Sequence, residues 1–185
     1  KKQNIDLITL NSHKIHGPKG VGALYVKRGL RLKRFSGGSS QENDLRPGTE
    51  NIPGIVGFSR AIEVAFKEFD KNVDHMSKLR DKLIKELLNI NGKLNGPLKE
   101  RLCNNVNISF NKVEGDSLIL KLSENGICAS TGSACSSKSL KPSHVLLAIG
   151  LKDREANGSV RLSLSKLNTE EEINYAIEKT KSLML

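Results

Sequence analysis

Apolar residues recur at three- and four-residue steps from Ile55 to about Ile90, and this repeat constrains the fold more than any other feature of the sequence. Such spacing lines one face of a helix, so we predict a long amphipathic helix with room for a single kink. A helix of this length predicts an element that runs from one domain to another. The repeat consists of Ile55, Phe58, Ile62, Ala65, Phe69, Val73, Met76, Leu79, Leu83 and Leu87.

The composition is that of a globular protein, because 185 residues with 37% hydrophobic content are sufficient to bury a core. No apolar run approaches the roughly 20 residues that a membrane-spanning helix needs, and the charged start Lys1–Asn4 lacks the apolar region of a signal peptide. We therefore expect a cytoplasmic protein without membrane contact. Three widely spaced cysteines argue against a disulfide framework and leave at least one thiol for chemistry.

A net charge of +10 raises the possibility of nucleic-acid binding. The lysines between Lys67 and Lys99 are, however, interspersed with acidic residues at helical spacings, and 4% aromatic content offers few stacking surfaces. We therefore expect no nucleic-acid partner. The densest basic cluster, Lys27 to Arg34, fits a partner-docking surface and a soluble loop equally well.

One lysine stands out by its position. The stretch Asn11 to Gly22 reads N-S-H-K-I-H-G-P-K-G-V-G, and strand-forming runs from Ile5 to Leu10 and from Val21 to Val26 flank it. Its glycines and proline allow a tight turn that would hold Lys14 still. Taken alone, Lys14 could be an ordinary surface lysine. His13 and His16 have too few neighbouring ligands for a closed metal site, and the Walker phosphate-loop order is absent.

The remaining elements predict a layered α+β unit from about residue 95 onward. We expect a loop over 35–43, an N-cap at Asn51, a half-buried strand over 105–110 and a helix over 116–124. A strand over 127–129, a helix over 143–149 and a strand over 160–164 follow, the last with Arg161 on its polar face. Thr169 and Glu172 fit a capping box for the final helix.

A second segment with chemical character surrounds Cys135, in S-T-G-S-A-C-S-S from Ser130 to Ser137. Small and hydroxyl side chains cannot pack a core, so this thiol should be exposed and reactive, with Lys138 and Lys141 near enough in sequence to stabilise its thiolate. Cys128, between Ile127 and Ala129, is predicted to be a buried small hydrophobe. The pattern leaves the role of Cys103 open.

The lysine turn, the R-P-G-T segment at Arg46–Thr49 and the cysteine loop, in this order, resemble the motifs of cysteine desulfurases of the nitrogenase and housekeeping iron-sulfur group. These are fold-type I enzymes that use pyridoxal 5'-phosphate. The resemblance implies that Lys14 carries the cofactor, that Cys135 forms a persulfide and that Arg161 binds the substrate carboxylate. It also implies cofactor-binding roles for Asn11, Ser12, His13 and Thr49, with Asn11 where the family usually has a phosphate-binding serine.

The implied fold class is α/β, the C-terminal part of a fold-type I transferase. Residues 1–54 would be the end of the large domain, 55–91 an interdomain helix, and 92–185 a smaller α+β C-terminal domain. The implied reaction converts L-cysteine to L-alanine, and the sulfur passes to an acceptor or iron-sulfur scaffold protein. The family acts as a homodimer. By the resemblance, Thr49 would reach the cofactor of the neighbouring subunit.

The resemblance covers only the C-terminal half of such an enzyme. The family's ring-stacking histidine and its aspartate for the pyridine nitrogen lie outside the matching part. The chain is therefore expected to be a fragment or one half of a split enzyme completed by a second chain. Two other classes stay open from the sequence: a non-catalytic sulfur-carrier or assembly subunit, and a basic nucleic-acid-binding module.

Overall fold

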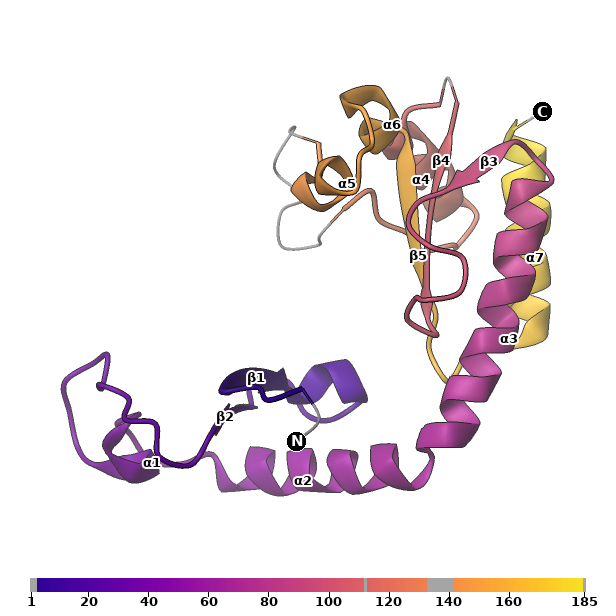
Figure 1. Cartoon of the computed structure of the whole chain (residues 1–185). Helices are drawn as coiled ribbons and strands as arrows, with labels where there is room; N and C mark the ends of the chain where they lie inside the picture. Colours follow the sequence, from indigo (N-terminus) through magenta and orange to yellow (C-terminus); the bar gives the residue numbers. More distant parts are fainter. Residues whose placement is uncertain (1–2, 112, 133–141, 185) are drawn as a thin grey trace. The chain divides into compact units, whose positions relative to one another are not determined.

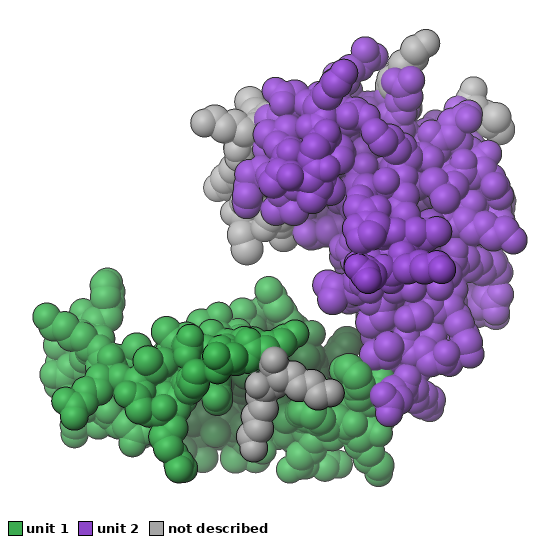
Figure 2. Space-filling model, in the orientation of Figure 1, with its two compact units in different colours: residues 1–69 green, residues 70–185 purple. Residues whose placement is uncertain are grey.

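The computed structural model describes residues 3–111, 113–132 and 142–184 and divides the chain into two compact units, Lys1–Phe69 and Asp70–Leu185 (Figures 1 and 2). The long predicted helix is present as two helices, α2 at Ile52–Lys67 and α3 at Phe69–Leu88. Glu68, with φ −103° and ψ 7°, interrupts them. The predicted kink is therefore a break, and the boundary between the units falls beside it. The domain limits expected from the sequence stay a prediction.

A β-hairpin forms the first part of unit 1. Strand β1, Leu7–Asn11, pairs antiparallel with β2, Gly22–Val26, in a register that sets Leu7 opposite Val26 and Asn11 opposite Gly22. The 3-10 helix η1, Ser12–Ile15, begins the connection between them. The two strands predicted around Lys14 are thereby confirmed, and the lysine lies on a helical turn.

The segment predicted as a loop over 35–43 ends in a short turn, α1, at Gln41–Asp44 (Figure 1). Its backbone is left-handed at Glu42, Asn43 and Asp44, with φ of 51°, 56° and 64°. Helix α2 then begins at Ile52, and the Gly54 amide donates to Asn51 Oδ1 over 3.1 Å. This hydrogen bond confirms Asn51 as the N-cap.

Unit 2 contains a three-stranded antiparallel sheet with the order β3-β4-β5, formed by Gly92–Leu94, Asn105–Phe110 and Ser159–Ser163. Helix α3, α4 at Gly115–Glu124 and α7 at Glu170–Met184 contribute to one core with this sheet. Ion pairs from Lys181 to Glu86 and from Lys82 to Glu170 join α7 to α3. The core contains Leu79, Leu83, Ile84, Leu87, Val106, Ile108, Phe110, Leu118, Leu122, Val160, Leu164, Ile173 and Ile177.

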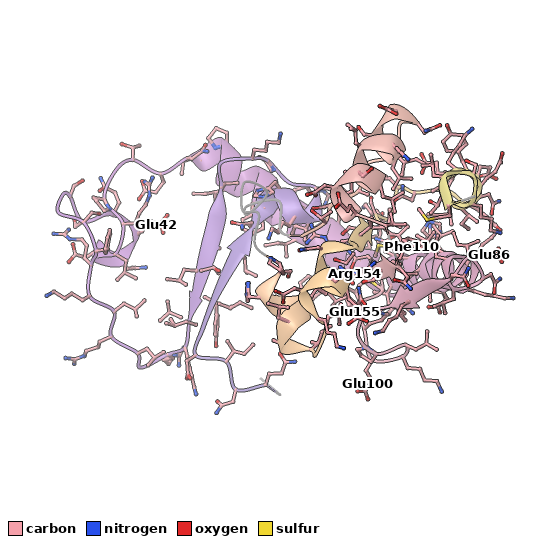
Figure 3. All side chains as sticks on the ribbon, turned by 90° about the horizontal axis from the view of Figure 1, so that it is seen from above. Glu42, Glu86, Glu100, Phe110, Arg154 and Glu155 are labelled. Carbon is pink, nitrogen blue, oxygen red and sulfur yellow. The ribbon has the colours of Figure 1, made fainter. Side chains whose placement is uncertain are left out.

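Strand β4 has its predicted limits, but its polar side is covered. Ser109 is only 5% exposed, because its hydroxyl accepts a hydrogen bond from Asn95 Nδ2 over 2.8 Å and donates one to the Glu155 carbonyl over 2.9 Å. Glu155 belongs to helix α6, Asp153–Asn157, which lies beside the Phe110 end of β4 (Figure 3). The prediction that β4 is half-buried holds from Asn105 to Ile108 and fails at Ser109, because the sequence predicted neither α6 nor β3.

The predicted strand over 127–129 is absent from the described part of the chain, and Cys128 is exposed where the sequence predicted burial. The reason is that the segment meets the sheet one residue later, where Ser130 forms an isolated bridge with Arg161. Helix α5, His144–Ala148, agrees with the predicted helix. The capping box of α7 is confirmed, since Glu172 Oε2 accepts from the Thr169 amide and Thr169 Oγ1 from the Glu172 amide.

Candidate functional site

Lys14 projects from η1 at the closed end of the hairpin. The turn is fixed by backbone hydrogen bonds from Ser12 N to the Val21 carbonyl (3.2 Å) and from Gly17 N to the Ser12 carbonyl (3.0 Å). Asn11, His13 and Lys14 are exposed. Among the residues that the structure describes, no group lies within hydrogen-bond or ion-pair distance of Lys14 Nζ. The backbone that carries Lys14 is therefore fixed by hydrogen bonds, and the side chain of Lys14 is exposed.

Helix α2 packs closely against this turn, and small residues form the contact on both sides. A Cβ added to Gly17 would lie 2.1 Å from Ser12 Oγ and 3.0 Å from the Ala61 side chain. A Cβ added to Gly57 would lie 2.5 Å from the Pro18 ring. Neither position tolerates a side chain without movement. Ser12 itself is fully buried, and its hydroxyl has no partner among the described residues, so this side chain is separated from the exposed neighbours of Lys14.

Thr49 lies on the loop before α2 and is exposed. It directly follows Gly48, whose φ of 102° is accessible to glycine at little cost. The Gly48 amide donates to the side-chain carbonyl of Gln41 over 3.0 Å. Thr49 thus belongs to the same unit as Lys14 and is carried by a separate, side-chain-stabilised loop.

Arg161 is in unit 2, at the centre of β5 and opposite Asn107. Its backbone pairs with Ser130 through two hydrogen bonds, of 2.6 Å and 3.1 Å. Its Nε is buried without a partner in the described residues. The residue after Ser130 is Thr131, and its Oγ1 donates a hydrogen bond to Asp116 Oδ1 over 3.0 Å. Cys135, the predicted nucleophile, lies outside the described residues, but the segment leading to it is anchored beside Arg161.

Several side chains that organise these loops were not identified from the sequence. Gln41 and Arg34 hold the segment before Thr49, and Asp116 holds Thr131. Each contact joins residues brought together by the local fold, and single contacts of this kind produce no periodic pattern. The run of glycine, serine and asparagine before Thr49 was the only signal, and it indicated a loop without its conformation.

Other parts of the described chain give weaker candidates for a functional site. A groove of about 690 Å³ in unit 2 is lined in part by Phe110, Arg154 and Glu155 (Figure 3), but it contains none of the motif residues. No group of three or more His, Cys, Asp or Glu side chains in the described ranges is arranged to hold a metal ion. Nor is any helix there long and apolar enough to cross a membrane.

Among the described residues, the pKa shifts that are resolved belong to charged groups of unit 2 outside the motifs. The hydrogen bond and the charge of Lys181 lower the pKa of Glu86. The hydrogen bond from Lys93 and that from the Lys152 amide do the same for the pKa of Glu155. Burial, with Arg80 nearby, lowers the pKa of Arg101. These groups bear on stability rather than on the candidate site.

The chain belongs to the aminotransferase class-V family, whose sequence pattern it matches over residues 1–175. Within that family it is similar to proteins named as cysteine desulfurases. It is 48% identical over 179 residues to cysteine desulfurase IscS 1 of Archaeoglobus fulgidus, a match that covers 96% of this chain and 47% of the relative. It is 49% identical over 179 residues to cysteine desulfurase IscS of Methanosarcina thermophila, covering 96% of this chain and 44% of the relative.

Solved structures agree with this assignment. A NifS-like protein superimposes with a TM-score of 0.88 at 40% identity, covering 98% of this chain and 47% of that one. A NifS-like protein from Rickettsia africae gives a TM-score of 0.87 at 29% identity, covering 97% and 47%. The mixed α/β fold is therefore that of part of a fold-type I enzyme. The chain spans about half the length of the relatives it matches.

Proposed function

We propose that this chain is part of a cysteine desulfurase, an enzyme that releases L-alanine from L-cysteine and holds the sulfur as a persulfide on Cys135. The observation that carries the proposal is 48–49% sequence identity to proteins named as such enzymes, along 96% of the chain. The presentation of Lys14 on a backbone-fixed turn supports it. We use "complete enzyme" for this chain together with the polypeptide, continuous or separate, that supplies the other half.

The exposed groups around Lys14 have the chemistry that pyridoxal 5'-phosphate needs. The free amine of Lys14 would hold the cofactor covalently, with the His13 imidazole beside it and the Asn11 amide available to its phosphate. The Thr49 hydroxyl would bind the phosphate of the cofactor in the neighbouring subunit. Each of these four side chains is exposed and able to reach a ligand. Ser12 is buried, with a hydroxyl that has no partner among the described residues, and its cofactor-binding role stays a prediction. When bound, the cofactor supplies an electron sink for the substrate carbon.

Three residues of this chain would have separate roles in the reaction. Arg161 would bind the substrate carboxylate, because a guanidinium offers two parallel hydrogen bonds to it. Lys14, as a free amine, would move protons at the substrate carbon atoms. The Cys135 thiolate would attack the substrate sulfur, so that a sulfur–sulfur bond forms and the carbon–sulfur bond breaks. The electron pair of that bond stays on carbon, which gains a proton and leaves as alanine.

The test combines a spectrum with a mass measurement on the complete enzyme. We expect borohydride reduction to fix the cofactor on Lys14, and Lys14→Ala to abolish its visible absorbance. Cys135→Ser should keep the absorbance and lose the persulfide, because only the sulfur acceptor is removed. Cys128→Ser, which alters an exposed cysteine outside the motif, is the matched control. A Cys135→Ser protein that still accumulated persulfide would refute the assignment.

The partners follow from the same proposal. We infer a homodimer in the cytoplasm, in which Thr49 serves the cofactor of the neighbouring subunit, and transfer of sulfur from Cys135 to an iron-sulfur scaffold or another acceptor. A second candidate is a non-catalytic sulfur-carrier or assembly subunit, which would keep Cys135 as its sulfur-binding thiol. Such a subunit would accept persulfide sulfur from a donor enzyme while showing no cofactor absorbance on its own.

A further inference from the structure

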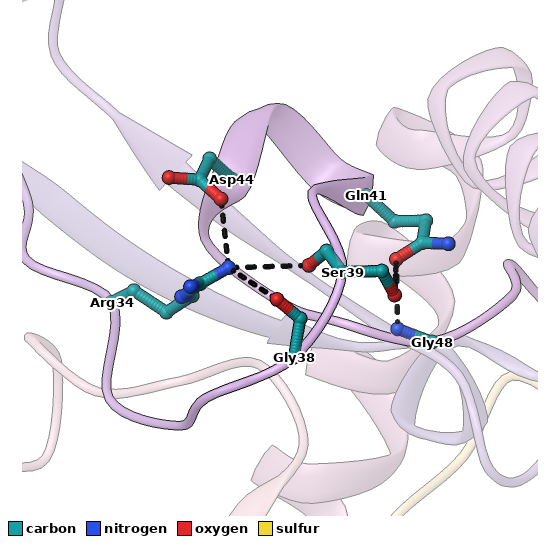
Figure 4. Close-up of polar contacts among 6 residues, drawn as sticks. All are labelled: Arg34, Gly38, Ser39, Gln41, Asp44 and Gly48. Carbon is teal, nitrogen blue, oxygen red and sulfur yellow. Dashed lines mark hydrogen bonds and ion pairs between the residues drawn. The ribbon is translucent and has the colours of Figure 1, made fainter.

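The segment before Thr49 is closed by a compact polar network (Figure 4). Arg34 is its first centre: Nη1 donates to the carbonyls of Gly38 (3.0 Å) and Ser39 (3.2 Å) and to Asp44 Oδ1 (2.8 Å). One guanidinium nitrogen therefore ties the beginning of the segment to the end of α1. The side chain of Arg34 is 30% exposed, and these hydrogen bonds lie at the surface of the segment.

Gln41 is the second centre of the network. Its Oε1 accepts from Ser39 Oγ over 2.6 Å and from the Gly48 amide over 3.0 Å (Figure 4). The contact with Gly48 spans seven residues and closes the segment on its far side. Because Gly48 immediately precedes Thr49, the Gln41 oxygen fixes the backbone from which Thr49 projects.

The backbone between these contacts is unusual. Glu42, Asn43 and Asp44 are left-handed in succession, although L-residues adopt this conformation mostly as single residues, at a cost of roughly 1–2 kcal/mol each. Such a conformation persists only where surrounding contacts determine it, and it is concentrated at functional sites. Here the contacts are those of Arg34 and Gln41, so the network maintains a strained turn next to an exposed hydroxyl.

We propose that Gln41 is a positioning residue for Thr49: by holding the Gly48 amide, it presents the Thr49 hydroxyl to the phosphate of the cofactor. The inference rests on the proposed function, since it takes pyridoxal 5'-phosphate as the ligand. Gln41 would not itself touch the reacting atoms. Its effect should therefore depend on whether the ligand carries a phosphate.

The experiment compares two ligands that differ only in that group. In the complete enzyme, Gln41→Met should weaken binding of pyridoxal 5'-phosphate by about tenfold, the equivalent of one hydrogen bond, and leave binding of pyridoxal unchanged. Methionine keeps the length of the side chain and removes the acceptor. Glu42→Gln is the matched control, because Glu42 is exposed, belongs to the same turn and makes no side-chain hydrogen bond or ion pair with the described residues.

A second measurement needs no cofactor. Hydrogen exchange at the Gly48 amide of the complete enzyme, prepared without cofactor, should be faster in Gln41→Met than in the unaltered enzyme and unchanged in Gln41→Glu, since a carboxylate retains the accepting oxygen. A Gly48 amide that exchanges equally in the unaltered enzyme and in Gln41→Met would contradict the role of Gln41, whatever the binding data show.

Thr49→Ala separates this inference from the proposed function. If Thr49→Ala weakens binding of the phosphorylated ligand alone and Gln41→Met does not, the inference fails and the proposed function stands. Equal weakening of both ligands by Gln41→Met would indicate general unfolding of the loop and would also overturn it. If the unaltered enzyme binds neither ligand, both proposals are wrong.

Discussion

At the scale of single residues, the packing of the Lys14 turn against α2 depends on two glycines as much as on the side chains around them. Gly17 and Gly57 lack a Cβ where the turn meets α2, and Ser12 is buried there with a hydroxyl that has no partner among the described residues. A buried unsatisfied hydroxyl is costly, and a side chain at Gly17 would collide with it. The two positions should therefore be energetically coupled.

We expect Ser12→Ala to leave the free energy of unfolding unchanged or to raise it by up to about 1 kcal/mol, because it removes an unsatisfied group. Gly17→Ala should destabilise the chain, and the double variant should recover part of that loss through removal of the 2.1 Å clash. Urea unfolding of the single and double variants measures the coupling. Strictly additive effects would show that the two sites do not share this contact.

Asn95 illustrates a residue whose importance is visible only in three dimensions. It is 3% exposed, and its Nδ2 donates to Asn107 Oδ1 (2.7 Å) and Ser109 Oγ (2.8 Å). The sequence context, N-G-P, indicated a loop and nothing more. Asn95→Ala should lower the free energy of unfolding by about 1–3 kcal/mol, because two acceptors lose their donor. Asn111→Ala, at an exposed asparagine, should change it by less than about 0.5 kcal/mol in the same denaturation assay.

At the scale of elements, local sequence patterns predicted the helices and strands well, whereas elements that depend on tertiary contacts were missed. The alternation of Val106, Ile108 and Phe110 predicted β4, and Thr169 with Glu172 predicted the start of α7, since both signals are local. The segment around Cys128 was misassigned because a three-residue apolar run does not reveal whether a partner strand is available. Strand β3 and helix α6 are so short that their stability comes from β4, and the sequence alone does not show that contact.

The pairing of α3 with α7 predicts an acid-sensitive contribution to stability. The pKa of Glu86 is lowered by its hydrogen bond to Lys181, so the unfolded chain binds more protons than the folded one as the pH falls. The contribution is complete above about pH 4.3, the ordinary value for glutamate, and is lost as the pH falls through the lower folded pKa. Glu86→Gln should therefore show a smaller loss of stability between pH 5 and pH 3. Unfolding curves at both pH values check this, with the exposed Glu124→Gln as control.

At the scale of the whole molecule, the two units differ in how much they bury. Unit 2 has a continuous apolar core, whereas in unit 1 the described buried residues are Ser12, Gly54 and Phe58. Side chains from both hairpin strands are 39–49% exposed, namely Leu7, Ile8, Leu10, Leu24 and Tyr25. A two-stranded hairpin is marginal in water by itself. Under the proposed function, we expect the rest of the complete enzyme to cover these side chains.

This contrast gives a prediction for the 185-residue chain alone. Amide protons of β1 and β2 should exchange at least tenfold faster than those of β4 and α3, because local opening costs less where little apolar surface is buried. Hydrogen exchange followed by mass spectrometry measures the difference. Addition of the polypeptide that completes the enzyme should slow exchange in the hairpin and leave the sheet of unit 2 unchanged. Equal protection in both units would contradict this account.

The bridge between Ser130 and Arg161 has a further consequence for how such an enzyme could change its substrate. Under the proposed function, Arg161 recognises the substrate carboxylate and Cys135 accepts the sulfur. The backbone hydrogen bonds between Ser130 and Arg161 then fix the start of the segment that leads to Cys135 beside the carboxylate-binding residue. Adaptation to a longer amino acid would then need a different number of residues between Gly132 and Cys135, while Arg161 keeps its position for the carboxylate. We would therefore search for relatives of different substrate selectivity among those with insertions between Gly132 and Cys135, rather than among those with insertions in β5.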